Sequence, residues 1–299
     1  MRRFDWLLII ILIVGAVGGK FADFGAGVPK SENPRRPSPE NFEPKAWDDE
    51  TQAWMSQAPE SRRNEIPGGA PLPDIGIIDG DNKRQSSTGS AFSISTKGFW
   101  LTARHVAEGC DTTFLQIGKR KGLKVTRTIL HPNADVALLV TQNAPPGLPI
   151  RDFQGRRRDD AFNVGFPKGQ PGAVHARYIG EMTMRHRGRM GFRERVNVWT
   201  EKSRIPSRFG SLGGLSGGAV LDDTGRIIGV VEAESRRRGR IMTAKTETLR
   251  EILARADARN GNQAVASGPL GADDYPTTAR RLITTLRVAK VICRVNRLS

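Results

Sequence analysis

Apolar and polar positions alternate through most of the middle of the chain, a spacing that predicts half-buried β-strands rather than helices. The clearest alternation covers residues 88–95; Lys97-Gly98 then marks a turn, and residues 99–102 begin a return strand. Further short apolar runs bounded by turn residues predict strands near 114–117, 123–125, 136–140, 160–166, 173–181, 196–201 and 219–231. We therefore expect an all-β body that starts near Leu72.

The body is expected to have two halves and a tail. Residues 143–149 are rich in proline and cannot belong to a central strand, so they link a first half, 72–143, to a second, 155–258. A helical period over 243–253, with Thr246 as cap, predicts a short helix that ends the body at 258. Residues 259–299 are expected to form a basic tail. Within this tail, 277–297 is either a basic amphipathic helix that lies on an anionic membrane surface or a disordered segment.

The N-terminus has the pattern of an export signal. Two arginines precede an almost unbroken apolar stretch over residues 6–19, which predicts a signal peptide or signal anchor in segment 1–24. The basic flank places the body outside the cytoplasm, so we expect an exported protein that is periplasmic, membrane-anchored or secreted. Residues 25–71 are rich in proline, glutamate and arginine and predict a disordered linker. Within it, 47–55 holds two tryptophans and a methionine that would dock a short helix.

The net positive charge does not by itself identify a binding partner. Lys and Arg outnumber Asp and Glu by 47 to 31 over 299 residues, a net charge of +16 that attracts nucleic acid or acidic lipid. The basic residues form short clusters, such as 156–158 and 236–238, without the interleaved aromatic residues on which single-stranded nucleic acids stack. We therefore interpret them as solvated loop charge and expect no specific nucleic-acid partner.

The chain has two cysteines, and neither indicates a metal site. Cys110 ends an apolar segment and Cys293 lies in the tail, so we expect two free thiols. Neither the cysteines nor the four dispersed histidines have the spacing of a zinc site. The sequence therefore predicts no metal and no cofactor.

The strongest chemical pattern is one serine among four glycines, in residues 213–219. A serine hydroxyl becomes an effective nucleophile only when a base accepts its proton and N–H donors receive the oxyanion that forms. Glycines allow a substrate carbonyl to approach the main chain closely around Ser216. Taken alone, the pattern is also typical of an ordinary Gly-rich turn.

Two residues upstream would supply the rest of a catalytic triad. His105 follows a predicted buried strand, and Asp135 precedes the apolar run 136–140. Taken singly, each has a structural alternative, as a satisfied histidine or a turn-capping aspartate. All four histidines precede Ser216, which excludes the Ser–acid–His order of α/β-hydrolases and matches the His–Asp–Ser order of chymotrypsin-type enzymes.

With TARHV at 102–106, DVALL at 135–139 and GLSGGA at 214–219, the chain resembles the trypsin-like (chymotrypsin-fold) serine peptidases, and within them the compact bacterial members. The resemblance covers roughly residues 86–253. It implies two six-stranded antiparallel β-barrels with the site in the cleft between them. His105 and Asp135 would come from the first barrel and Ser216 from the second.

The resemblance also implies roles for these residues. Ser216 would be the nucleophile, His105 the general base and then acid, and Asp135 the residue that orients the imidazole. The N–H groups of Gly214 and Ser216 would form the oxyanion hole. A substrate-binding strand would line the primary specificity pocket and pair with the substrate backbone; it comprises Val230, Val231, Glu232, Ala233 and Glu234.

Three positions depart from the family pattern. Leu215 replaces the aspartate that in animal members pairs with a newly cut N-terminus, so that activation switch is expected to be absent. Arg104 places a bulky charge beside His105, where a small residue is usual, and Gly210 occupies the position that sets basic preference in trypsin. Glu232 and Glu234 are alternative sources of a preference for basic side chains.

The sequence predicts an exported serine endopeptidase that acts on polypeptides through an acyl-enzyme. Two alternatives remain open. One is a catalytically inactive relative that keeps the barrels and binds peptides or partners. The other is a basic envelope or nucleic-acid binding protein, suggested by the net charge of +16.

Overall fold

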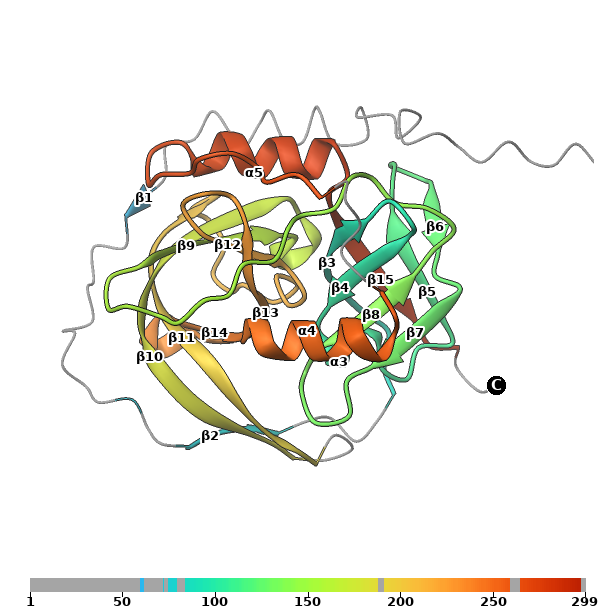
Figure 1. The fold of residues 1–299 in the computed structure, drawn as a ribbon, viewed down its shortest axis with the longest axis horizontal. Helices are drawn as coiled ribbons and strands as arrows, with labels where there is room; N and C mark the ends of the chain where they lie inside the picture. The colour runs from blue at the N-terminus through green and yellow to red at the C-terminus, as the bar shows by residue number, and fades with distance from the viewer. Residues whose placement is uncertain are drawn as a thin grey trace, which may run out of the picture. The chain divides into compact units, whose positions relative to one another are not determined.

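Strands dominate the described part of the chain and form two sheets that lie side by side (Figure 1). The computed structural model describes residues 60–61, 72, 75–79, 84–187, 191–258 and 264–296. All of them belong to one unit of the chain, Ser38–Ser299. The expected export signal and the helix expected at 47–55 lie outside the described residues. None of the helices within the described ranges is long and apolar enough to cross a membrane.

The first sheet has seven strands in the order β6-β5-β15-β3-β4-β8-β7, all paired antiparallel. The strands are β3 (Ser87–Ser95), β4 (Phe99–Thr102), β5 (Thr112–Gln116), β6 (Gly122–Lys124), β7 (Arg127–Leu130), β8 (Ala137–Val140) and β15 (Val288–Arg294). The predicted β3–β4 hairpin is confirmed, with its turn at Gly98, where φ is +88°. This left-handed backbone favours glycine.

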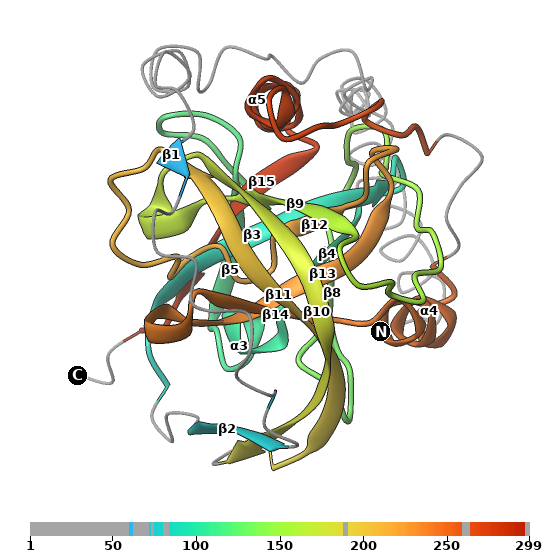
Figure 2. The same cartoon turned by 90° about the vertical axis from the view of Figure 1, so that its left-hand side faces the viewer.

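The second sheet closes into a six-stranded ring. Its order is β1-β11-β14-β13-β12-β9-β10-β2, and a further antiparallel pairing of β10 with β11 joins the ring. The strands are β1 (Glu60–Ser61), β2 (Ile75–Asp79), β9 (Asp160–Gly165), β10 (Gly172–Arg187), β11 (Arg193–Ile205), β12 (Ala219–Leu221), β13 (Ile227–Ser235) and β14 (Arg240–Ala244). Figure 2 shows that β10 and β11 extend beyond the ring as a long hairpin whose end carries β2.

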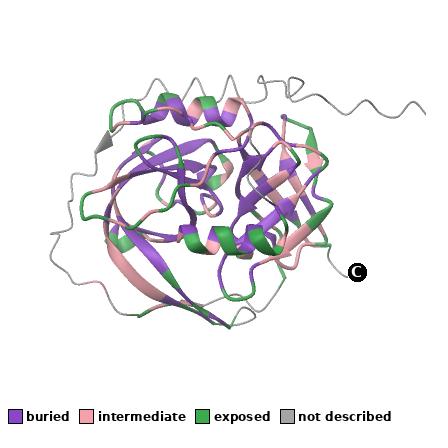
Figure 3. Cartoon of the chain, in the orientation of Figure 1, coloured by how far each residue is buried: buried purple, intermediate pink, exposed green. Residues whose placement is uncertain are grey.

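The main apolar core joins the two sheets. It contains fully buried side chains from the first sheet, such as Phe92 and Leu138, and from the second, such as Val164 and Ile227. Figure 3 shows that buried residues concentrate in the strands of both sheets, whereas exposed residues follow the loops and the outer faces of the helices. The all-β fold class is therefore confirmed, with two β-sheets packed against a shared core.

Two short strands, β1 and β2, belong to the second sheet although they lie in segments that the sequence analysis assigned elsewhere. β2 lies in the segment expected to belong to the first half, but it pairs in parallel with β10 of the second sheet. β1 lies inside the expected linker 25–71 and pairs with β11. Both attach to the long edges of the β10–β11 hairpin, whose length the sequence pattern underestimated.

The expected basic tail is the largest correction. Residues 264–296 are part of the body: α5 (Tyr275–Thr284) packs on the core, and β15 lies between β3 and β5. The apolar face of α5 is fully buried at Leu282 and Ile283, so the helix packs on the body and does not present this face to a membrane. The alternation over Val288–Arg294 is that of a strand, and it was masked by an apolar spacing that also fits a helix.

The body does contain the predicted helix over 243–253, which is observed as α4 (Thr246–Arg255). Its N-cap residue is Lys245 rather than Thr246. The Thr246 hydroxyl instead accepts a hydrogen bond from the main-chain N–H of Phe153 at 3.4 Å.

Cys110 and Cys293 form a disulfide, and the prediction of two free thiols is wrong. The two residues are 183 positions apart in the sequence. They meet because β15 lies beside β5 in the first sheet, which brings the end of the chain to the segment that precedes β5. The prediction failed because it placed Cys293 in a tail.

Candidate active site

His105 lies where the sequence predicts it, at the start of a single helical turn directly after a buried strand. β4 is followed by the buried Ala103 and then by α3 (Arg104–Ala107). The main-chain N–H of Arg104 donates to the carbonyl of Asp135 at 3.1 Å, which joins this turn to the segment before β8. The local fold therefore brings residues 105 and 135 together.

Two hydrogen bonds connect His105 to the carboxylate of Asp135. Nδ1 of His105 lies 2.6 Å from Oδ2, and the main-chain N–H of His105 donates to Oδ1 at 2.8 Å. The carboxylate is 2% exposed, whereas the imidazole is 37% exposed. One edge of the ring is thus fixed, while the other, which carries Nε2, has no hydrogen-bonding partner among the described residues.

The environment of this pair raises the pKa of His105 above its ordinary value. Burial of the ring lowers the pKa, but the charge of Asp135 and the hydrogen bond to it act in the opposite direction and prevail. Because the ring is partly exposed, water screens part of this effect.

Arg104 is directed away from the imidazole. Its guanidinium donates to both carboxylate oxygens of Glu108 at 3.1 Å and to the carbonyl of His131 at 2.8 Å. It also lies 5.3 Å from the centre of the Phe192 ring. The charge that the sequence places beside His105 is therefore neutralised on the far side of α3.

Ser216 lies on a loop that is attached to the first sheet. Its carbonyl accepts the main-chain N–H of Ser90, in β3, at 2.8 Å. The hydroxyl of Ser216 donates to the carbonyl of Glu232 at 3.2 Å. In this structure the hydroxyl is thus not hydrogen-bonded to His105, although both residues lie beside the junction of the two sheets.

The glycines around Ser216 are required by its backbone. Gly214 has φ +97° and Gly217 has φ +83°, both in the left-handed region. A Cβ at Gly214 would lie 2.6 Å from the carbonyl oxygen of Phe166. The hydroxyl of Ser90 donates to the Gly214 carbonyl and accepts from the N–H of Phe166, each at 2.8 Å, and so fixes the loop against β9.

The main-chain N–H groups proposed as oxyanion donors are available. The carbonyl of Gly213 accepts from the N–H of Lys168 at 2.6 Å, which fixes the orientation of the peptide group that also carries the N–H of Gly214. Within the described ranges, the N–H groups of Gly214 and Ser216 have no acceptor. Leu215, between them, is fully buried in an apolar cluster, so packing rather than an ion pair holds the loop.

The expected substrate-binding residues, 230–234, lie on β13. Val230 and Val231 are buried, and β12 pairs with β13 only as far as Val230. The carboxylate of Glu234 accepts from the hydroxyl of Ser211 at 2.6 Å and from the N–H of Leu212 at 2.9 Å. Ala233 and Glu234 pair with β14 on one side only, so the other edge of this segment is not paired with a strand of the described chain.

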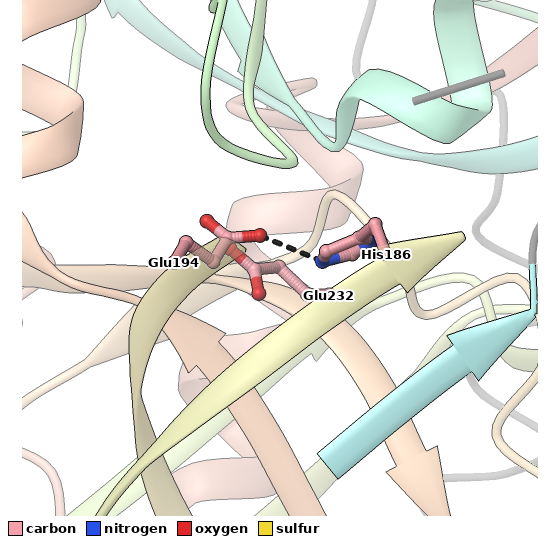
Figure 4. A group of neighbouring side chains, drawn as sticks. All are labelled: His186, Glu194 and Glu232. Carbon is pink, nitrogen blue, oxygen red and sulfur yellow. Dashed lines mark ion pairs between the residues drawn. The ribbon is translucent and has the colours of Figure 1, made fainter. Parts of the chain in front are cut away.

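Glu232 does not line an accessible pocket. The register of β13 with β14 shifts between Val231 and Ala233, so Glu232 lies at a bulge, and it is 2% exposed. Its carboxyl group lies beside Glu194 of β11 and His186 of β10 (Figure 4). The expectation that Glu232 selects basic substrate side chains is therefore not supported. The carboxylate of Glu234 is bound to the neighbouring loop through Ser211 and Leu212.

His186 and Glu194 are residues near the site that the sequence analysis missed, and they lie beside Glu232, which it assigned to the substrate-binding strand. One ligand-type atom from each lies within 4.8 Å of the others, and all three side chains are buried. Glu194 connects them to Asp135, whose main-chain N–H points at both of its oxygens, at 3.1 and 3.2 Å. His186 and Glu194 lie between the strands predicted at 173–181 and 196–201, in a segment for which the sequence pattern predicts no element, so nothing in the sequence indicated that they lie together.

A family comparison matches residues 89–230 to the trypsin-like peptidase domain. Among the curated proteins, no sequence matches this chain. Among solved structures, the chain is similar to the Rv3671c protease from M. tuberculosis in its active form, with a TM-score of 0.47 and 19% identity over 68% of this chain and 95% of that one. It is also similar to the HtrA-type protease AlgW with decapeptide, with a TM-score of 0.44 and 23% identity over 56% of this chain and 51% of that one.

Proposed function

Since residues 89–230 place the chain among the trypsin-like peptidases, we propose that it is a serine endopeptidase that uses His105, Asp135 and Ser216 as its triad. The observation that carries the proposal is the pair of hydrogen bonds from His105 to the carboxylate of Asp135, which fixes the imidazole with Nε2 free to act as base. A structural histidine would have both ring nitrogens satisfied. Here the exposed nitrogen is the one that catalysis needs.

In the proposed reaction, Nε2 of His105 accepts the proton of the Ser216 hydroxyl as Oγ attacks the substrate carbonyl. The N–H groups of Gly214 and Ser216 stabilise the oxyanion, and one such donor is worth about 10²–10³ in rate. The protonated imidazole then gives its proton to the leaving amine, and an acyl-enzyme remains on Ser216. Water, activated by His105, releases the second product.

The reaction requires the Ser216 hydroxyl to leave the carbonyl of Glu232 and donate to His105 instead. Catalytic hydrogen bonds are often long or unformed without substrate. The proposed substrate site is the edge of β13 beyond Val231, where an extended peptide can add to the sheet through main-chain hydrogen bonds.

We further propose that the protein is exported. Its N-terminal pattern of basic residues before an apolar stretch supports this, and so does the disulfide between Cys110 and Cys293, since disulfides persist in oxidising compartments. Alkaline phosphatase fused after residue 71 should be active outside the cytoplasm. Activity only when the first 24 residues are replaced by a known export signal would contradict export.

A second candidate is a non-catalytic relative that binds peptides. The bond from the Ser216 hydroxyl to Glu232, rather than to His105, favours it. A fluorophosphonate probe separates the two functions because it labels only an activated serine. We expect labelling of the full-length protein that is lost in Ser216→Ala and in His105→Ala, with Ser86→Ala, at an exposed serine outside the site, as a matched control that keeps the label. Absence of labelling in every variant would favour the binding protein.

A further inference from the structure

The cluster of His186, Glu194 and Glu232 has more negative charge than its donors can satisfy. The charged and titratable groups that face Glu232 are Glu194 from β11 and Asp135 from the turn before β8, while His186 of β10 faces Glu194. On the β14 side, the strand partners of β13 are the uncharged Thr243 and Met242. Neither oxygen of the Glu232 carboxyl has a donor within the described ranges.

Glu194 has the opposite arrangement, since a main-chain N–H donates to its carboxylate and a histidine nitrogen lies close to it. It faces the main-chain N–H of Asp135 with both oxygens, and Oε1 lies 2.8 Å from Nε2 of His186. One carboxyl oxygen of Glu232 lies within 4.8 Å of an oxygen of Glu194, although neither oxygen of Glu232 has a hydrogen-bonding partner among the described residues. A protonated Glu232 would supply a further donor to Glu194 and would remove one of three neighbouring negative charges.

Electrostatics favours this proton. Burial raises the pKa of Glu232 well above its ordinary value, and the charges of Glu194 and Asp135 raise it further. Burial also raises the pKa of Glu194. Arg104 is paired with Glu108, and its guanidinium contacts the ring of Phe192, on which His186 also stacks.

We propose that Glu232 is held as the neutral acid, donates its proton to Glu194, and with it forms a positioning pair that fixes Asp135 from behind. The inference rests on the proposed function, since Asp135 is the aspartate that orients His105. Glu194 holds the main chain of Asp135, and the main-chain carbonyl of Glu232 holds the Ser216 hydroxyl. One buried pair therefore contacts both ends of the triad.

Loss of the proton would place two charged carboxylates against each other in a buried site, which is strongly unfavourable. Their separation would move the bulge of β13, and with it the carbonyl that contacts Ser216, as well as the support of Asp135. Activity should therefore fall on the alkaline side as Glu232 ionises.

The three side chains are also of types that bind metal ions. Nε2 of His186 lies 2.8 Å from Oε1 of Glu194, and a single proton on Glu232 already relieves the repulsion between the two carboxyls. A bound metal ion is therefore an outcome of the test that would overturn the proposal.

The kinetic test uses the full-length protein and three variants. Glu232→Gln keeps a donor to Glu194 and cannot ionise, Glu232→Ala removes the donor, and Glu247→Gln makes the same chemical change at an exposed position of α4. We expect Glu232→Ala to lower kcat by up to about 100-fold with a smaller change in KM, since misplacement of a catalytic group costs about that much. Glu232→Gln should restore most of this loss and should lack the alkaline decline of wild type, which Glu247→Gln should retain.

A second readout does not depend on activity. In the Ser216→Ala background, the free energy of unfolding is measured against pH with Glu232 and with Glu232→Gln. Because the folded protein keeps Glu232 neutral while the unfolded chain ionises it from about pH 4 upward, the protein with Glu232 should lose stability relative to Glu232→Gln as pH rises. This difference should persist even if wild type proves inactive, so the two proposals fail separately.

Two results would overturn the proposal. One is a pair of parallel stability curves together with identical pH–activity profiles for wild type and Glu232→Gln. The other is one equivalent of tightly bound metal in the purified protein, measured by elemental analysis, that is absent from both Glu232→Gln and His186→Ala.

Discussion

His105 is oriented by two hydrogen bonds to the carboxylate of Asp135, one from its ring and one from its main-chain N–H. The sequence predicts the proximity of the two residues, since a histidine after one buried strand and an aspartate before another meet when β4 and β8 pair. The sequence does not predict that Glu194 contacts the main chain of Asp135, or that His186 and Glu232 lie next to Glu194. Glu194 and His186 reach the site only because β10 and β11 form a long hairpin, and Glu232 does so through a bulge.

The pH dependence of hydrolysis should report on His105. Since its pKa is raised, kcat/KM should increase with pH and level off only above the ordinary range of a histidine, because the base must be neutral. Asp135→Asn removes the charge that raises this pKa, so the rise should move to lower pH. The same variant should lower kcat by about 10⁴, because the imidazole loses its orientation.

Asp152→Asn makes the same change at an exposed aspartate that pairs with Arg250, and it should leave the profile unchanged. An acid limb that is identical in wild type and Asp135→Asn would contradict the assignment of the limb to His105.

Gly214→Ala tests the loop that carries the proposed oxyanion donors. The new Cβ would lie 2.6 Å from the carbonyl oxygen of Phe166 on a backbone with φ +97°, so the loop must shift. We expect kcat to fall by about 10²–10³ through loss of the donor, with the protein still folded. Gly118→Ala is the control, since its Cβ makes only ordinary contacts. Unchanged kcat in Gly214→Ala would show that this N–H is not a donor to the transition state.

At the scale of elements, β15 connects the end of the chain to the segment around His105. Its neighbours are β3, which anchors the Ser216 loop, and β5, which follows α3. The disulfide from Cys293 reaches Cys110 just after α3. The sequence could not indicate this pairing, because a strand whose partners lie more than 170 residues earlier in the chain has no local pattern that identifies them.

Replacement of both cysteines by serine should therefore destabilise the region around His105. Removal of a native disulfide typically costs about 2–5 kcal/mol. We expect a lower midpoint of denaturation, measured by urea titration, and a similar fall for wild type under reducing conditions. If the variant and the reduced protein unfold at the same urea concentration as oxidised wild type, the disulfide does not contribute to stability.

At the scale of the whole molecule, the C-terminal segment supplies β15, an interior strand of the first sheet between β3 and β5. Over residues 86–253 the sequence predicts most strands in their order along the chain, although it underestimates the length of β10 and β11 and omits β7 and β14. It fails for residues 264–296, because their helix and strand are amphipathic in a way that fits either a surface helix or packing on a core. The structure decides between the two: β15 pairs with both β3 and β5, so residues 288–294 form a strand inside the first sheet.

Truncation after Ala258 tests this arrangement. Loss of α5 and β15 would expose the edges of β3 and β5 and the core residues that Leu282 and Val288 cover, so we expect an aggregated or unfolded product. Truncation after Asn296 keeps both elements and should give a folded protein with native near-ultraviolet circular dichroism. A folded, active 1–258 fragment would contradict the structural role of the segment.

The proposed acyl-enzyme is the central claim, and it can be observed directly. Full-length protein is mixed with an excess of an activated peptide ester, quenched in acid and analysed by intact and peptide mass spectrometry. The account predicts one acyl group on the peptide that contains Ser216 in wild type, and none in Ser216→Ala or His105→Ala. Peptide hydrolysis that continues undiminished in Ser216→Ala would contradict the account.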